Sequence, residues 1–178
     1  MQTSRRLSSG FTLLEVLVSI AVSGVLTAVA LPSLGEQVER QRMRGIGESL
    51  RNDLQVARAQ ALTQHRSVRV AFIQTDTGSC YVVYQGPANA CTCDSDGAIQ
   101  CKPGASALSA QGVADKLGVQ LSANVSTMVF DGRTGTVAPT GTMTLKTRQG
   151  LEMKHIVSIT GRIRSCGDVG HQTPACRG

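Results

Sequence analysis

The chain has 178 residues and a formal net charge of +6, with two tyrosines, three phenylalanines and no tryptophan. So few aromatic rings argue against a surface that stacks nucleobases, and the charge is only mildly basic. The 19 glycines, together with many Thr, Ser and Val residues, predict a turn-rich β domain.

An apolar run lies near the start of the chain, where residues 11–31 contain a single ionisable side chain, Glu15. As a helix, this run would be roughly 30 Å long, enough to cross a bilayer. Arg5 and Arg6 precede it without an acid, which predicts a cytoplasmic N-terminus and an exported remainder. A plain anchor and a removable signal cleaved after residues 28–30 are the alternatives. The glutamate in the apolar core and a helical pattern that continues past residue 30 argue against the removable signal.

The segment Gly-Phe-Thr-Leu-Leu-Glu at residues 10–15 resembles the class III signal of type IV pilins and type II secretion pseudopilins. The resemblance implies that prepilin peptidase cleaves between Gly10 and Phe11, and that the new Phe11 amine is methylated. It also implies that Glu15 pairs with the Phe11 amine of a neighbouring subunit during assembly. This pairing suits a carboxylate in lipid, which needs a cationic partner. Pro32 stands where pilin helices commonly carry a proline and is expected to bend the anchor.

A helical stretch is predicted from about residue 33 to 64, because apolar residues recur at three- and four-residue intervals. The positions are Leu34, Val38, Ile46, Leu50, Leu54, Ala57 and Ala61. Gly45 and Gly47 weaken this helix by about 1 kcal/mol each relative to Ala. Its polar face carries six arginines among four acids, and we interpret it as a solvated face near anionic lipid headgroups rather than a nucleic-acid site. These arginines are Arg40, Arg42, Arg44, Arg51, Arg58 and Arg66.

Short alternating segments after the helix predict strands at 67–73, 80–84, 119–121 and 127–130. Residues 131–135 are expected to form a turn, because Asp131-Gly132 can supply the positive φ of a tight turn. Residues 86–118 show no sustained period and are expected to form a surface loop held by disulfides.

The last third of the domain predicts a β-hairpin, with strands at 142–148 and 151–159. Met143, Leu145, Ile156 and Ile159 are expected to face the helix, and the basic residues Lys146, Arg148 and Lys154 to face outward. A long N-terminal helix packed on an antiparallel sheet is an α+β, type IV pilin-like fold. The predicted organisation is a leader at 1–10, a transmembrane helix at 11–31, its amphipathic continuation at 32–65 and a periplasmic β-rich domain at 66–178.

The six cysteines are Cys80, Cys91, Cys93, Cys101, Cys166 and Cys176. An even number in an exported chain predicts up to three disulfides. Cys166 and Cys176 close a short C-terminal segment and are expected to pair. The other four can pair as 80–91 with 93–101 or as 80–93 with 91–101, since a bond from 91 to 93 would strain the loop. Zinc is the alternative, but the spacings match no standard ligand pattern, so no metal is expected.

Neither a catalytic site nor a cofactor is expected. His65, His155 and His171 lie far apart in the sequence, with no acid or nucleophile at motif spacing, and are interpreted as ordinary surface or strand residues.

The segment Gly161-Arg162-Ile163-Arg164 is the clearest candidate for a binding site. Arginines two residues apart in an extended segment project to the same side, and guanidinium groups bind phosphate oxygens in a fork-like manner. Residues 142–178 carry six Lys or Arg against two acids. DNA held in this way would be bound by its backbone, without sequence preference and with strong salt dependence.

The helix-to-strand junction at residues 50–70 resembles that of the GspH/FimT family of minor pilins, and Gly-Arg-x-Arg resembles the motif of FimT minor pilins, which bind DNA during natural transformation. The resemblance implies that Gly161, Arg162 and Arg164 bind double-stranded DNA; Lys146, Arg148 and Lys154 are added from the strand pattern. The alternative is a structural subunit that primes a type IV pilus or a type II secretion pseudopilus. Either way, the expected partners are other major and minor pilins, inner-membrane lipid and prepilin peptidase. The expected location is the bacterial inner membrane, with a single pass and a periplasmic domain, and then the pilus tip.

Overall fold

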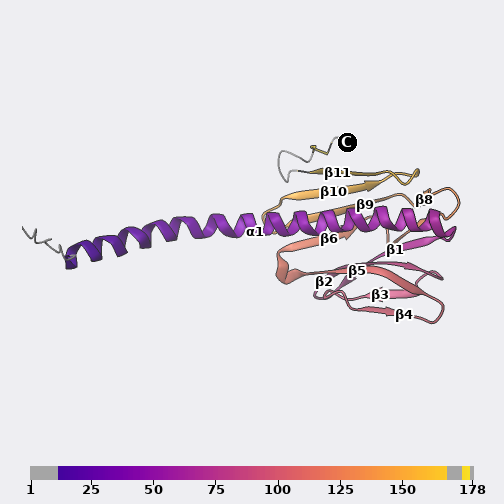
Figure 1. The fold of residues 1–178 in the computed structure, drawn as a ribbon, viewed down its shortest axis with the longest axis horizontal. Helices are drawn as coiled ribbons and strands as arrows, with labels where there is room; N and C mark the ends of the chain where they lie inside the picture. Colours follow the sequence, from indigo (N-terminus) through magenta and orange to yellow (C-terminus); the bar gives the residue numbers. More distant parts are fainter. Residues whose placement is uncertain (1–11, 168–173, 177–178) are drawn as a thin grey trace, which may run out of the picture. The chain divides into compact units, whose positions relative to one another are not determined.

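The structure is a computed structural model that describes residues 12–167 and 174–176, without the side chains of residues 28–34. The chain forms two compact units, Met1–Gln37 and Val38–Gly178, which are described separately below. Helix α1 (Leu13–Gln64) contributes to both of them (Figure 1). Gly10 and Phe11, where processing is expected, lie outside the described residues.

The first unit is the beginning of α1. The hydroxyl of Thr12 accepts a hydrogen bond from the backbone N–H of Glu15 at 3.2 Å, which caps the first turn. The hydroxyls of Ser19, Ser23 and Thr27 each donate to the carbonyl four residues earlier, so these polar groups are satisfied within the helix. Judged over the residues that the structure describes, no helix combines the length and mean hydropathy needed to cross a membrane.

In the second unit, one face of α1 packs into the main core. The predicted stripe is confirmed from Ile46 onward, and Met43 extends it towards the N-terminus. Val38 departs from the prediction, because 44% of its surface is exposed. The buried helix residues are Met43, Ile46, Leu50, Leu54, Ala57 and Ala61. Spacings of three and four residues place them on one side of the helix.

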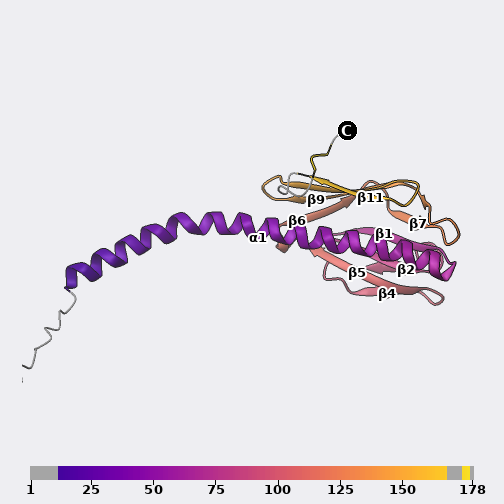
Figure 2. The ribbon, with the colours of Figure 1, turned by 45° about the horizontal axis from the view of Figure 1, so that its top comes forward.

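The described residues of this unit form eleven strands. They are β1 (Val68–Thr75), β2 (Gly78–Gln85), β3 (Cys91–Cys93), β4 (Ile99–Cys101), β5 (Ser106–Ala114), β6 (Val119–Ala123), β7 (Thr127–Phe130), β8 (Val137–Ala138), β9 (Gly141–Thr147), β10 (Glu152–Val157) and β11 (Ile163–Gly167), with a 3₁₀ turn at Asp115–Leu117. The sheet orders are β5-β2-β1-β7-β8, β11-β10-β9-β6 and β3-β4, and the paired strands are antiparallel. In Figure 1, β9, β10 and β11 lie above the helical segment, and β1, β2, β5 and β6 lie below it. In the turned view of Figure 2, β9 and β11 again lie above it and β5 below it. The predicted α+β architecture, a long N-terminal helix packed on antiparallel sheet, is confirmed.

The hairpin of β9 and β10 forms, but the inward face predicted for β10 was wrong. Met153, His155 and Val157 are buried against the helix, whereas 65% of Ile159 is exposed and Ile156 lies on the other face. Successive side chains of a strand alternate between faces, so Ile156 must share the outward face with Lys154. The prediction that Ile156 faces inward and Lys154 outward was therefore inconsistent with the pleat.

Residues 86–118 are more ordered than the loop expected from the sequence. β5 pairs with β2 along eight residue pairs, while β3 and β4 cover the far side of the five-stranded sheet. Every residue of β2 is buried as a result. A strand that is buried on both faces has a continuous apolar sequence, as residues Tyr81–Tyr84 do. β5, by contrast, consists largely of small half-buried residues without alternation, which is why it was missed.

Three disulfides are present, and they follow the second of the two arrangements left open by the sequence. The bonds are Cys80–Cys93, Cys91–Cys101 and Cys166–Cys176. Cys80–Cys93 ties β3 to β2, and Cys91–Cys101 joins directly opposed residues of β3 and β4. Cys166–Cys176 attaches the C-terminal segment to β11.

The turn after β7 forms at 131–135, but the glycine with positive φ is not the predicted Gly132. Gly135, with φ +66°, takes the left-handed conformation, whereas Gly132 does not. The carboxylate Oδ1 of Asp131 accepts hydrogen bonds from the backbone N–H groups of Arg133 and Thr134, both at 2.9 Å. These bonds lower the pKa of Asp131 below its usual value.

Candidate nucleic-acid interface

Gly161 sets the position of the Gly-Arg-Ile-Arg motif. Its φ of +72° closes the β10–β11 hairpin, where its N–H donates to the Ser158 carbonyl at 2.8 Å. A Cβ at this position would lie 2.5 Å from the Gly135 carbonyl oxygen and 2.7 Å from Arg58 Nε. The motif thus begins with a residue that must be glycine, for reasons of both conformation and space.

Arg162 and Arg164 are both exposed, and among the described residues neither forms an ion pair. Arg164 belongs to β11, the edge strand of its sheet, and Arg162 immediately precedes that strand. Ile163 and Ser165 point towards the helix side, because Ser165 Oγ lies 2.8 Å from Nδ1 of the buried His155. Strand alternation therefore directs the two arginines to the outward face, where Arg164 stands opposite Ile156 of β10, at the edge of the sheet.

Lys146 and Lys154, two of the three basic residues added from the strand pattern, lie together on the outward face of the four-stranded sheet. Both contact the same carboxylate oxygen, Oε1 of Glu152, at 3.7 Å from Lys146 Nζ and 3.2 Å from Lys154 Nζ. One acid thus offsets part of the charge of two lysines. Such partly exposed ion pairs contribute little to stability, and a competing anion can displace them.

Arg148 lies apart from the motif arginines. Its Nη2 donates to the Asp115 carbonyl at 3.0 Å, and it follows β9 at the end of the sheet opposite to Arg162. Six residues of β10 separate the two ends, which is roughly 20 Å of strand. The fold therefore divides the predicted residues into a motif pair, a lysine pair and an isolated arginine.

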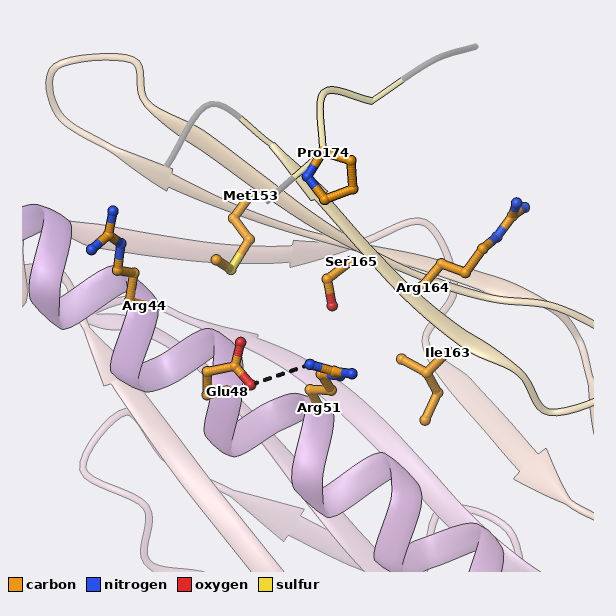
Figure 3. Close-up of a pocket in the computed structure, with 8 residues that line it drawn as sticks. All are labelled: Arg44, Glu48, Arg51, Met153, Ile163, Arg164, Ser165 and Pro174. Carbon is orange, nitrogen blue, oxygen red and sulfur yellow. Dashed lines mark ion pairs between the residues drawn. The ribbon is translucent and has the colours of Figure 1, made fainter. Parts of the chain in front are cut away.

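A groove of about 840 Å³ runs between α1 and β11 (Figure 3), and we call it the helix–strand groove. It is lined by Arg44, Glu48, Arg51, Met153, Ile163, Arg164, Ser165 and Pro174. Arg51 Nη1 lies 3.6 Å from Glu48 Oε2. The polar face of the helix, interpreted from sequence as merely solvated, thus lies next to the motif. Sequence reasoning missed this proximity, although the seven-residue spacing of Arg44, Arg51 and Arg58 was a usable signal.

A second hollow of about 450 Å³ adjoins Ile163 and brings Arg58 close to Arg162. Its other lining residues are Gln55, Ala59, Leu62 and Gly161. Arg58 Nε donates to the Gly135 carbonyl at 3.3 Å, which holds the base of its side chain. Ile163 lines both hollows, so each motif arginine stands beside at least one helix arginine.

His155 is buried next to the groove-lining Ser165 and adds no charge to the groove. Burial lowers its pKa to about 4, so the imidazole is neutral at physiological pH. Its Nε2 has no hydrogen-bond partner among the described residues. The sequence interpretation as an ordinary strand residue did not anticipate this burial, which the alternation Met153-His155-Val157 could have indicated. His171 lies outside the described residues.

Across residues 12–167 and 174–176, no three His, Cys, Asp or Glu side chains form a group suited to a metal ion. All six cysteines are in disulfides. What the site offers chemically is therefore exposed guanidinium groups at a sheet edge and along a groove. Such groups bind phosphate or carboxylate oxygens.

Comparison with known protein families gives two matches. Residues 47–161 match the family described as type II transport protein GspH. Residues 5–31 match the prokaryotic N-terminal methylation motif. A search of curated protein sequences gives no significant match.

Solved structures share the fold at low sequence identity. The type IV minor pilin FimU of Pseudomonas aeruginosa is 18% identical with a TM-score of 0.53, over 71% of this chain and 90% of FimU. The minor pseudopilin EpsH of the type 2 secretion system of Vibrio cholerae is 14% identical with a TM-score of 0.50, over 70% of this chain and 95% of EpsH. Identities this low establish similarity of fold alone.

Proposed function

The chain belongs to the family described as type II transport protein GspH, and we propose that it is a minor pilin that binds extracellular double-stranded DNA without sequence preference, for uptake in natural transformation. The observation that carries this proposal is the exposure of Arg162 and Arg164 at a sheet edge, without ion-pair partners among the described residues. Guanidinium groups in this state can bind phosphate without first breaking an internal ion pair.

Gly161, Arg162 and Arg164 form the centre of the proposed DNA site. Lys154 and Lys146 extend it across the outward face once phosphate competes with Glu152 for their ammonium groups. Arg148 contributes least, because it is distant from the motif and already donates to the Asp115 carbonyl. Contacts of this kind read the DNA backbone, so affinity depends on salt and little on sequence.

The remaining functional assignments concern anchoring and assembly. In this proposal residues 1–10 are removed by prepilin peptidase, Phe11 becomes the methylated N-terminus, and 11–31 anchors the chain in the inner membrane by a single pass. Residues 32–65 then continue the helix, and 66–178 form the periplasmic domain. Glu15 joins the subunit to other major and minor pilins in the filament. The match to the N-terminal methylation motif supports this arrangement.

A second candidate is a structural subunit that primes a pilus or a type II secretion pseudopilus without binding DNA. Glu152 favours this candidate, because it offsets part of the lysine charge on the outward face. Under it, Arg162 and Arg164 contact acidic residues of a neighbouring subunit.

The deciding experiment measures binding of the full chain, purified in a non-ionic detergent, to short duplexes of unrelated sequence at several salt concentrations. Arg162→Ala/Arg164→Ala is compared with Arg42→Ala/Arg133→Ala, which removes the same charge from two exposed arginines outside the site. We expect wild-type affinity to be equal across sequences and to fall steeply with salt. Loss of two phosphate contacts should reduce the slope of log K against log salt by about 2 in the motif variant only. Absence of wild-type binding at low salt would favour the structural subunit.

A further inference from the structure

We infer that the bound DNA backbone follows the helix–strand groove, where Arg51 and Arg58 of α1 hold phosphates alongside Arg164 and Arg162. This inference rests on the proposed function. It assigns the path of the DNA backbone and adds Arg51 and Arg58 to the binding residues. The competing path crosses the outward face of the four-stranded sheet over Lys146 and Lys154. Both paths begin at the same motif, because the motif arginines stand at the edge of the sheet and also line the two hollows.

The first observation is the spacing of the helix arginines. Arg44, Arg51 and Arg58 are seven residues apart, which returns nearly to the same side of an α-helix after two turns. At about 1.5 Å per residue, Arg51 and Arg58 lie roughly 10 Å apart along the helix axis. That length corresponds to about three base pairs of duplex axis.

The second observation is that this row lies beside the motif. Arg44, Arg51 and Arg164 line the helix–strand groove, and Arg58 and Arg162 line the adjoining hollow. Ile163 separates the two hollows and belongs to both. Five arginines from segments about a hundred residues apart in sequence therefore border one continuous track.

Charge favours the groove over the outward face. Apart from Arg162 and Arg164, which both paths share, the described residues that line the two hollows include three arginines and one acid, Glu48, and so carry a net charge of +2. On the outward face, Glu152 is shared by the two lysines and leaves one net positive charge from these three residues. A polyanion is therefore held more strongly along the groove.

The guanidinium groups of Arg51 and Arg58 can each still bind a phosphate. The bond of Arg51 to Glu48 is a partly exposed ion pair at 3.6 Å, which phosphate can displace. Arg58 donates only through Nε in the contacts described, to the Gly135 carbonyl, and its Nη atoms have no partner among the described residues. Arg44 already contacts another group, so only Arg51 and Arg58 are assigned as phosphate-binding residues on the helix.

The shape of the site favours an extended anion over a single ion. Figure 3 shows Arg44 and Arg51 on the helix side of the groove, whereas the Arg164 side chain extends from β11 away from the helix, so the three guanidinium groups do not converge on one point. A sugar–phosphate backbone presents successive charges along a line and can meet such a row.

The test compares two variants of equal charge change in the full chain in non-ionic detergent, with a short duplex of arbitrary sequence as the probe. Arg51→Gln/Arg58→Gln removes the groove contacts, and Lys146→Gln/Lys154→Gln removes the outward-face contacts. Arg42→Gln/Arg133→Gln controls for the loss of two positive charges, since the Arg42 side chain donates to the Leu117 carbonyl and Arg133 lies in the 131–135 turn. We expect the groove variant to bind the duplex roughly tenfold or more weakly at low salt. The slope of its log K against log salt concentration should be smaller by about 2. The lysine variant should lose severalfold less affinity than the groove variant, because its ammonium groups only extend the site. Arg42→Gln/Arg133→Gln should remain within about twofold of wild type once salt screens long-range charge.

A further variant is expected to raise the affinity for DNA, which misfolding could not do. Among the described residues that line the groove, Glu48 is the one acid. Glu48→Gln removes it and leaves every arginine in place, so DNA binding should tighten severalfold. Unchanged or weaker binding by Glu48→Gln would overturn the inference.

The remaining outcomes are distinct. If the lysine variant loses affinity and the groove variant does not, or if both lose equally, the groove path is wrong while DNA binding stands. If the groove variant loses binding to anionic phospholipid vesicles but keeps its DNA affinity, the groove belongs to the membrane and the inference is overturned. If wild type fails to bind DNA at low salt, the proposed function itself is wrong.

Discussion

A Cβ added at Gly47 of α1 would lie 3.1 Å from Nε2 of His155 on β10. His155 is fully buried, and Ser165 Oγ holds the other side of its ring through Nδ1. The absence of a side chain at position 47 thus lets the helix approach the sheet directly over the imidazole. This close approach also determines the width of the helix–strand groove, since Glu48 and Ser165 line it on opposite sides.

The two helix glycines should respond to alanine in opposite ways. Nothing lies within 4 Å of a Cβ at Gly45, so Gly45→Ala should raise the free energy of unfolding by about 1 kcal/mol through helix propensity. At Gly47 the new methyl meets Met153 Sδ and His155 Nε2, and overpacking costs about 1–3 kcal/mol. We expect Gly47→Ala to be less stable than Gly45→Ala by about 1–3 kcal/mol in chemical denaturation. Equal gains from both substitutions would mean that the helix does not approach the sheet this closely.

Stability should depend on pH through His155. Burial lowers its pKa to about 4 in the folded state, with Arg51 adding to the decrease and Glu48 and the Gly47 backbone opposing it. In the unfolded chain the pKa is about 6.5, so below that pH the unfolded state binds the proton more readily. The stabilising contribution is complete above pH 6.5 and is lost as the pH falls towards 4, by about 3 kcal/mol in total.

His155→Gln should remove this part of the pH dependence. We expect the free energy of unfolding of the variant to fall less than that of wild type between pH 6.5 and 4. His65→Gln, which changes an exposed histidine, should follow wild type over the same interval. Parallel pH curves for wild type and His155→Gln would contradict the burial of a neutral imidazole.

Gly161→Ala should damage the motif without removing a charge. The substitution places a Cβ at φ +72° and 2.5 Å from the Gly135 carbonyl oxygen, and the left-handed conformation alone costs about 1 kcal/mol or more. We expect a loss of at least about 2 kcal/mol in unfolding free energy, since a backbone oxygen cannot move away cheaply. Gly104→Ala is the control, because it shares a positive φ but has nothing within 4 Å. It should lose only the conformational part, and equal losses would argue against the packing of Gly161.

Removing the C-terminal disulfide should affect both stability and DNA binding. Cys166–Cys176 and Cys91–Cys101 have the same sequence separation of 10, so the loop-closure model predicts similar losses of roughly 2–3 kcal/mol from paired Ser substitutions. Only the former holds the segment containing Pro174, which lines the helix–strand groove. We therefore expect Cys166→Ser/Cys176→Ser alone to change the affinity for duplex DNA. A matching change in Cys91→Ser/Cys101→Ser would indicate a general loss of folding instead.

The spacing of apolar residues in the sequence predicted those helices and strands in which one face is buried and the other exposed. The helix stripe from Ile46 to Ala61 and the alternation in β9 were readable, because one face of each is buried and the other is exposed. β10 could be placed as a strand, yet its facing was misjudged, since Ile156 is apolar but lies outward while the polar His155 lies inward. Hydrophobicity alone therefore assigned the wrong face, and the strand pleat decided it.

The sequence by itself determined the features that depend on neighbouring residues: the N-terminal signal, the long helix, most strands and the presence of the Gly-Arg-Ile-Arg segment. Tertiary structure alone decided how the other four cysteines pair and that residues 86–118 cover a sheet. It also decided that Glu152 is shared by Lys146 and Lys154, and that Arg51 and Arg58 border the motif. These relationships join segments far apart in the chain, because α1 and β11 meet only when both pack on the same core. No local period in the sequence carries that information, so the candidate DNA track emerges only from the folded chain.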